Sequence, residues 1–165
     1  ELYTLAKSYE VGKLSSAAFL NSLHHIFPEA TPQALTRAWN AIILDFPETR
    51  LQFIEELSRE ANYRLFLLSN TNDMHIEYVK ETMGIENYER FKACFEQFYL
   101  SHEIKLRKPN TDIYEFVLQK NKLNPKETLF IDDTEENTEG AKKLGIKCWH
   151  LQVGLDDITD LKDRL

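Results

Sequence analysis

The chain has 165 residues, 42% of them hydrophobic and 28% charged, and it carries a net charge of −7. That length allows one compact domain with a small appendage. The acidic balance argues against a surface for nucleic acid or an anionic membrane, although a local cation would still admit a small phosphorylated substrate. No apolar run approaches the roughly 20 residues that span a bilayer.

The first 60 residues carry a helical pattern. Ser15 or Ser16 is expected to cap one helix, Thr31-Pro32 to open a second and Pro47 to begin a third. The apolar positions recur at helical spacing, at Phe19, Leu20, Leu23, Ile26, Leu35, Ala38, Trp39, Ile42, Leu51, Ile54 and Leu57.

The pattern then changes to short apolar runs that alternate with helical segments. The run 63–68 is typical of a strand buried on both faces. Such an alternation predicts an α/β fold with a parallel sheet and right-handed crossovers. Strands are expected at 63–68, 93–100, 128–131 and 146–151, and helices at 72–83, 110–121 and 133–144, before a short polar C-terminal segment.

Both cysteines, Cys94 and Cys148, lie in apolar, strand-like runs. Free buried thiols are expected there rather than a disulfide, which suits a reducing compartment. We therefore expect a cytoplasmic protein, and no signal peptide is visible in these residues.

Paired acids, Asp132 and Asp133, follow the third apolar run directly. Adjacent carboxylates at a desolvated strand end repel each other unless a cation compensates them. Their hard oxygen atoms suit Mg²⁺, which takes one or two carboxylates and keeps several waters. The alternative is that one acid caps the following helix and the other is solvated.

Two further polar groups are expected at the same edge of the sheet, where active sites of such folds lie. Ser69 and Asn70 end the first strand and open a helix, which suits phosphate binding but equally suits helix capping. Lys108 precedes Pro109 and a helix, so its ammonium is held where it can neutralise phosphate oxygens. A solvated basic turn is the alternative for Lys108.

Three segments, in this order, resemble motifs of the haloacid-dehalogenase superfamily. LFLLSNTN is similar to the second motif, LRKPNTDIYEFVL to the third and TLFIDDTEENTEGAKKLGI to the fourth. The match covers roughly residues 50 to 152. Within the superfamily, LSNTND and YLSHEIKLRKP resemble the small-capped sugar-phosphatase branch of glucose-1-phosphatase-like proteins.

The resemblance implies a Mg²⁺-dependent hydrolase that acts on a small phosphorylated metabolite, either a sugar phosphate or a nucleotide-like ester. By this resemblance, Ser69 would hydrogen-bond the phosphoryl group, Asn70 would hold the phosphate-binding loop and Lys108 would bridge phosphoryl oxygens and nucleophile. Asp133 would be the principal magnesium ligand, with Asp132 beside it as an auxiliary acid.

The first motif of that family, DxDx(T/V), has no counterpart in the chain, although its first aspartate is the nucleophile. Asp45 follows the apolar run 41–44, but Pro47 stands two positions later and the run continues a helical pattern, so Asp45 is interpreted as a helix end. The resemblance therefore implies a nucleophile outside this chain, on a central strand that in the family's sheet lies between the runs ending at Leu68 and Ile131. Without it, the 165 residues are expected to turn over little or nothing.

The resemblance also implies two parts: a partial helical cap at 1–46 and an α/β core at 47–165. Caps exclude water and select the substrate, so His24, His25 and Trp39 are candidate substrate contacts, with packing or surface roles as the alternative. His75, His102 and His150 show no metal-ligand spacing and are assigned no chemistry.

Several other functions stay open. A phosphorylation receiver domain has its acids earlier in the chain, which disfavours it. A catalytically silent phosphate- or partner-binding relative and a haloacid dehalogenase are the alternatives, although the acid pair argues against the dehalogenase. Asn137 stands where many relatives carry another aspartate, so its role is open. An unfilled slot in the sheet would also favour association, such as a homodimer.

Overall fold

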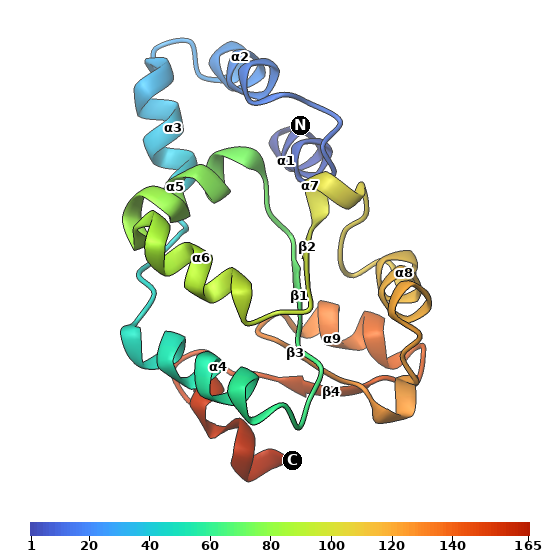
Figure 1. The fold of residues 1–165 in the computed structure, drawn as a ribbon. Coiled ribbons are helices and arrows are strands. Elements are labelled where there is room, and N and C mark those ends of the chain that lie inside the picture. The colour runs from blue at the N-terminus through green and yellow to red at the C-terminus, as the bar shows by residue number, and fades with distance from the viewer. The chain divides into compact units, whose positions relative to one another are not determined.

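A computed structural model describes residues 1–165 and contains nine α-helices, four β-strands and two 3-10 helices (Figure 1). The chain forms two compact units, Glu1–Lys105 and Leu106–Leu165. None of the helices is long and apolar enough to cross a membrane. This division differs from the expected boundary near residue 46, and the cap and core assignment stays a prediction.

The first unit opens with four helices: the three predicted ones and α1, which falls within the helical pattern expected for the first 60 residues. The Ser15 side chain accepts a hydrogen bond from the N–H of Ala18, and Thr31 accepts one from Ala34, which confirms both predicted caps. The four helices are α1 (Leu2–Glu10), α2 (Ser16–Ile26), α3 (Pro32–Asn40) and α4 (Glu48–Glu60).

The connection between α3 and α4 corrects one expectation. Asp45 lies within this connection and not at a helix end, because α3 stops at Asn40. Ile42 and Leu44 are 70% and 80% exposed, so the apolar run gains no burial that would extend the helix. Pro47 further restricts the residue before it to extended backbone.

A parallel pair of strands completes the first unit, and the two strands lie side by side in Figure 1. Phe66 pairs with Gln97 and Ser69 with Leu100. The residues of β1 are half-buried and not fully buried as expected. The elements of this part are β1 (Phe66–Ser69), α5 (Asp73–Met83), α6 (Ile85–Ala93), β2 (Gln97–Leu100) and α7 (Ser101–Ile104).

The expected strand 93–100 is wrong in its first four residues, because the unexpected helix α6 extends to Ala93. Gly84, at φ +83°, ends α5 and allows α6 to begin at the next residue. Tyr88 is the buried anchor of α6, at 4% exposure. The sequence predicts a helix over 72–83 but no second helix directly after this glycine.

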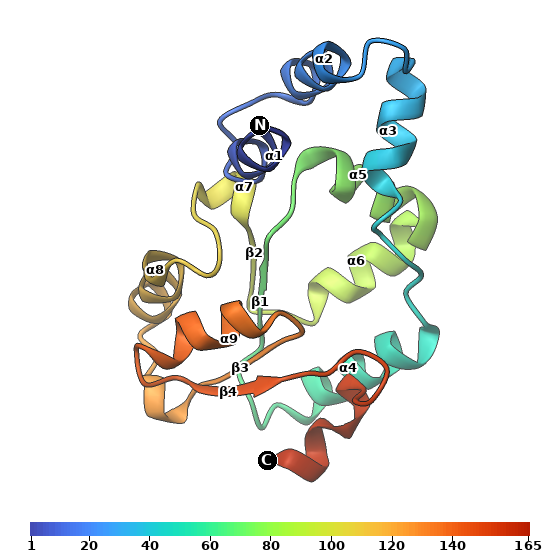
Figure 2. The ribbon, with the colours of Figure 1, turned by 180° about the vertical axis from the view of Figure 1, so that it is seen from behind.

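The second unit follows the predicted order, with element ends shifted by one or two residues. β3 and β4 pair in parallel, with Asp132 opposite His150, and α9 lies alongside both strands (Figure 2). The polar C-terminal segment forms a 3-10 helix with Leu161 buried. The elements are α8 (Thr111–Asn121), η1 (Pro125–Glu127), β3 (Leu129–Asp132), α9 (Glu135–Lys142), β4 (Lys147–His150) and η2 (Ile158–Arg164).

Two parallel two-stranded sheets, β1–β2 and β3–β4, confirm the α/β class and the alternation of strands and helices. Both cysteines are free thiols, as expected, although Cys148 is only half-buried. The central first strand stays a prediction.

Aromatic packing forms the main core of the first unit. Tyr9 stacks on Phe19 at a centroid distance of 4.3 Å, and Trp39 meets Phe19 edge-on at 4.6 Å. Trp39 therefore packs against the core. His24 and His25 are exposed, and each ring lies within hydrogen-bond distance of a carbonyl of its own helix region.

Replacing Phe19 by Ala is expected to lower the free energy of unfolding by about 3–5 kcal/mol, because a fully buried ring leaves a cavity. Urea unfolding followed by circular dichroism measures the loss. Phe27→Ala is the matched control, since Phe27 is 45% exposed and should lose much less. Equal losses in the two variants would contradict this description of the core.

Candidate functional site

The second unit contains a buried ion pair between two residues singled out from the sequence. The Lys108 Nζ atom lies 2.6 Å from Oδ2 of Asp132, and the side chains are only 8% and 6% exposed. Lys108 comes from the loop before α8, where its bond to Pro109 is cis, and Asp132 is the last residue of β3. The alternative of a solvated basic turn is therefore excluded for Lys108.

The second oxygen of Asp132 accepts two further hydrogen bonds. Its Oδ1 atom accepts from the N–H of Thr134 and from the side-chain amide of Asn137, both at 2.9 Å. A carboxylate offers about four lone-pair sites, so these three donors leave about one. Asp132 is thus held rigidly and orients the ammonium of Lys108.

Apart from the Lys108 ammonium, neutral groups surround this buried carboxylate. Asn137 is 8% exposed, and its carbonyl accepts a 2.7 Å hydrogen bond from the hydroxyl of Tyr114. Burial, and then the charge of Asp132, raises the pKa of Tyr114, so the phenol stays a donor. An aspartate at position 137 would place a second negative charge against Asp132, whereas the amide donates to it.

Asp133 has a different environment. It is exposed, and its carboxylate makes no hydrogen bond or ion pair with the protein, while its backbone carbonyl lies 3.1 Å from Nε2 of His150. No cluster of three or more His, Cys, Asp and Glu side chains forms a ready metal cage. Mg²⁺ is commonly held by one or two carboxylates and water, so the open carboxylate of Asp133 fits this ion.

Tyr114 and His150 support the site, although sequence analysis predicts no role for either. His150 had a detectable signal, because a residue at the end of β4 must lie opposite the end of a parallel β3. Tyr114 had no such signal in the sequence, because an aromatic residue on a helix face is ordinarily a core residue.

A glycine allows α9 to approach the Lys108 loop closely. A Cβ atom at Gly140 would clash with the carbonyl oxygen of Pro109 and come within 3.1 Å of the Tyr114 ring. Gly140 therefore belongs to the positioning of Lys108, because any larger residue would push the loop away from α9.

The first unit places Ser69 and Asn70 at the carboxyl end of β1, as predicted. The residue that caps α5 is Asn72, whose Oδ1 accepts the N–H of His75 at 3.1 Å. The N–H of Met74 is also occupied, by the hydroxyl of Tyr9. Ser69 and Asn70 are thus not the helix cap, and the capping alternative for them is wrong.

The loop after β1 is fixed by buried hydrogen bonds within its unit. Ser101 accepts the N–H of Thr71 at 2.9 Å, and its hydroxyl lies 2.6 Å from its acceptor, the carbonyl of Glu10. Thr71 and Asn72 are 6% and 0% exposed. Ser69 and Asn70 therefore precede a rigid segment. That these two residues meet Lys108 and the acid pair in one site stays a prediction.

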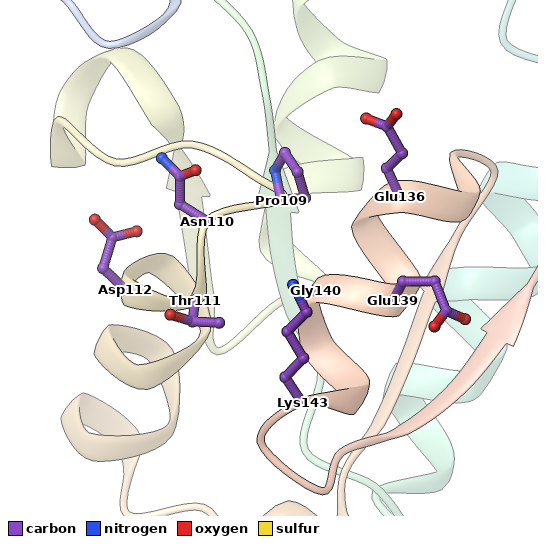
Figure 3. Close-up of a pocket in the computed structure, with 8 residues that line it drawn as sticks. All are labelled: Pro109, Asn110, Thr111, Asp112, Glu136, Glu139, Gly140 and Lys143. Carbon is purple, nitrogen blue, oxygen red and sulfur yellow. The ribbon is translucent and has the colours of Figure 1, made fainter.

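The second unit also has an open cleft of about 610 Å³ between the start of α8 and α9 (Figure 3). Its lining residues include three acids, Asp112, Glu136 and Glu139, and a single lysine, Lys143. An acidic lining of this kind repels phosphate. Lys108, Asp132 and Asp133 do not line it, so this cleft is separate from the candidate site.

A family model and a characterised relative both match the chain. The model of haloacid dehalogenase-like hydrolases matches residues 6–151. A D-ribitol-5-phosphate phosphatase of Bacteroides thetaiotaomicron is 28% identical over 148 residues, which cover 89% of this chain and 71% of that protein.

Solved structures show the same relationship. A HAD family enzyme from Bacteroides thetaiotaomicron, in complex with magnesium and inorganic phosphate, is 34% identical with a TM-score of 0.78, covering 93% of this chain and 77% of that chain. A predicted HAD-like family hydrolase from Porphyromonas gingivalis is 26% identical with a TM-score of 0.79, covering 99% and 78%.

Replacing Lys108 by Met is expected to destabilise the protein by about 3–5 kcal/mol, because the carboxylate of Asp132 stays buried without its cation. The double variant Lys108→Met/Asp132→Asn should recover part of that loss, because an amide oxygen still accepts from Thr134 and Asn137. Urea unfolding measures both. Lys143→Met, at an exposed position, is the control. A double variant less stable than Lys108→Met would contradict the pairing.

Proposed function

Because the chain belongs to the haloacid dehalogenase-like hydrolases, we propose that it contributes most of a magnesium-dependent phosphatase for a small sugar phosphate. The observation that carries the proposal is the buried Lys108–Asp132 pair. The sugar-phosphate class is supported by the similarity to the ribitol-5-phosphate phosphatase and agrees with the resemblance to sugar phosphatases.

Lys108 supplies positive charge for the phosphoryl oxygens. Its ammonium has three donor hydrogens, and one is directed at Asp132. A phosphoryl group carries its charge on the equatorial oxygens during transfer, so a fixed ammonium stabilises the transition state without reorganisation. Asp132 orients this ammonium, because almost all lone pairs of its own oxygens already accept hydrogen bonds from Lys108, Thr134 and Asn137.

Ser69 and Asn70 are the phosphate-binding residues of the first unit in this proposal. The hydroxyl of Ser69 donates to a phosphoryl oxygen, and Asn70 shapes the loop that presents it. Their support is their place at the carboxyl end of β1, just before the buried residues Thr71 and Asn72, together with the capping of α5 by Asn72 and not by either of them.

Asp133 would hold Mg²⁺, with at most about one coordination position from Asp132. When bound, the metal neutralises phosphoryl oxygens and orients the group for in-line attack. His150 contributes by fixing the backbone of Asp133 through its carbonyl.

The nucleophile of this proposal is an aspartate outside residues 1–165 that forms an aspartyl-phosphate intermediate. The chain contains no DxD pair, and covalent catalysis supplies a large part of the rate acceleration. The 165 residues by themselves would then bind phosphate and magnesium with little turnover.

Replacing Asp133 by Ala in the intact protein is expected to lower magnesium-dependent hydrolysis of sugar phosphates by about 100-fold or more, because the open metal ligand is lost. Hydrolysis across a panel of sugar phosphates and nucleotides, with and without magnesium, measures this. The fold should persist, since the exposed carboxylate has no protein partner.

Asp163→Ala removes another exposed carboxylate, on η2, and is the control that should keep full activity. Unchanged activity in Asp133→Ala would remove the metal assignment. A wild-type protein without hydrolysis of any ester in the panel would instead favour the catalytically silent alternative.

A further inference from the structure

Three side chains at the junction of α3 and α5 form a closed hydrogen-bonded ring. Oδ1 of Asn72 accepts the indole N–H of Trp39 at 3.3 Å, and the Asn72 amide nitrogen lies 3.1 Å from Nδ1 of His75. Nε2 of His75 lies 3.0 Å from the backbone carbonyl of Trp39 and closes the ring. The His75 and Trp39 rings also stack, with centroids 5.2 Å apart.

The ring determines the orientation of the amide. Two N–H groups, from Trp39 and from the backbone of His75, both point at one atom of the Asn72 side chain, so that atom must be the oxygen. The amide nitrogen then faces Nδ1 of His75 as a donor. Nδ1 must accept, and Nε2 must carry the proton that it donates to the Trp39 carbonyl.

We propose that His75 is a positioning residue of the phosphate-binding loop, which it holds in place only as the neutral Nε2–H tautomer. This inference rests on the proposed function, because it assigns regulation by protons to the loop that carries Ser69 and Asn70. A second proton on Nδ1 would face the amide nitrogen of Asn72, donor against donor, and would open the ring.

The ring reaches the loop directly. Asn72 is fully buried, at 0% exposure, and stands two residues after Asn70. Thr71 between them is tied to Ser101, so the segment has one support on α7 and the other on α3. Loss of the His75 contact would leave the Asn72 amide nitrogen without its partner, while the amide oxygen stays held by Trp39 and the backbone of His75.

The charges around His75 agree with a neutral ring. His75 is 5% exposed, and burial lowers its pKa, while the carbonyl of Trp39 and the charge of Glu10 on α1 oppose that shift. On its own helix, Asp73 pairs with His102 of α7 at 3.3 Å. The contacts from α3 come from the uncharged Trp39.

Because the folded-state pKa lies below the ordinary value of about 6.5, the unfolded chain binds the proton first as the pH falls. The stabilisation of the folded state by neutral His75 is complete above about pH 6.5. It is lost as the pH falls from that value to the lower folded-state pKa of His75. Loop order and catalytic efficiency should decline through the folded-state pKa.

Long-range proton–nitrogen NMR of the uniformly ¹⁵N-labelled chain tests the tautomer without any need for turnover. At pH 7.5 we expect Nδ1 of His75 to be bare and Nε2 to be protonated. On acidification, the amide signals of Asn70, Thr71 and Asn72 should shift with the same midpoint as the His75 ring. A charged ring at pH 7.5, the opposite tautomer, or loop amides that stay still while the ring titrates would overturn the proposal.

Two variants extend the test. In Asn72→Asp the carboxylate keeps both N–H acceptor contacts but offers Nδ1 no donor, so the titration midpoint of His75 should rise by about 1–3 pH units. In His75→Gln the acid shift of the loop amides should vanish. An unchanged midpoint in the first variant or a persistent shift in the second would refute the inference.

Enzymatic measurements separate this inference from the proposed function. His75→Gln should lower kcat/KM for a sugar phosphate about tenfold at pH 7.5. It should also remove the fall of kcat/KM at acid pH whose midpoint matches the titration of the His75 ring. Glu81→Gln, an exposed carboxylate on the same helix, is the control that should keep the wild-type pH profile. An active His75→Gln with an unaltered profile would overturn the positioning role, whereas a wild type without turnover ends only the phosphatase proposal.

Discussion

A buried charge requires a fixed partner, and the second unit is organised around this constraint. Lys108 and Asp132 are both nearly inaccessible to water, and each would be costly to bury alone. The loop before α8, the end of β3 and the first turn of α9 must therefore hold one mutual geometry. Gly140 allows the close approach, and Asn137 provides a donor without adding charge.

The two adjacent acids consequently have different tasks. Asp132 has given almost all of its hydrogen-bonding capacity to Lys108, Thr134 and Asn137, so it acts as a structural support for the ammonium. Asp133 keeps an open carboxylate and is held through its backbone only. The electrostatic repulsion between neighbouring carboxylates is relieved because one of them is neutralised within the protein.

The first unit also buries polar groups that require fixed partners, and there the partners are neutral. Polar groups of the loop after β1 pair with Ser101, Trp39 and His75, and the N–H of Met74 in the first turn of α5 pairs with Tyr9. Buried polar groups that are satisfied in this way make a single loop conformation much more favourable than its alternatives. Order at the strand end thus follows from hydrogen bonds that reach across helices far apart in the sequence.

Local signals in the sequence determined the helix caps at Ser15 and Thr31, the order of strands and helices, and the choice of Lys108 and the acid pair. Each depends on residues within one turn or one strand. The break after Asn40, the helix at 85–93 and the roles of Tyr114, His75 and His150 were decided only by the tertiary structure. The physical reason is that burial and hydrogen-bond partners in these places come from residues distant in the chain, and the same side-chain types would otherwise be surface or core residues.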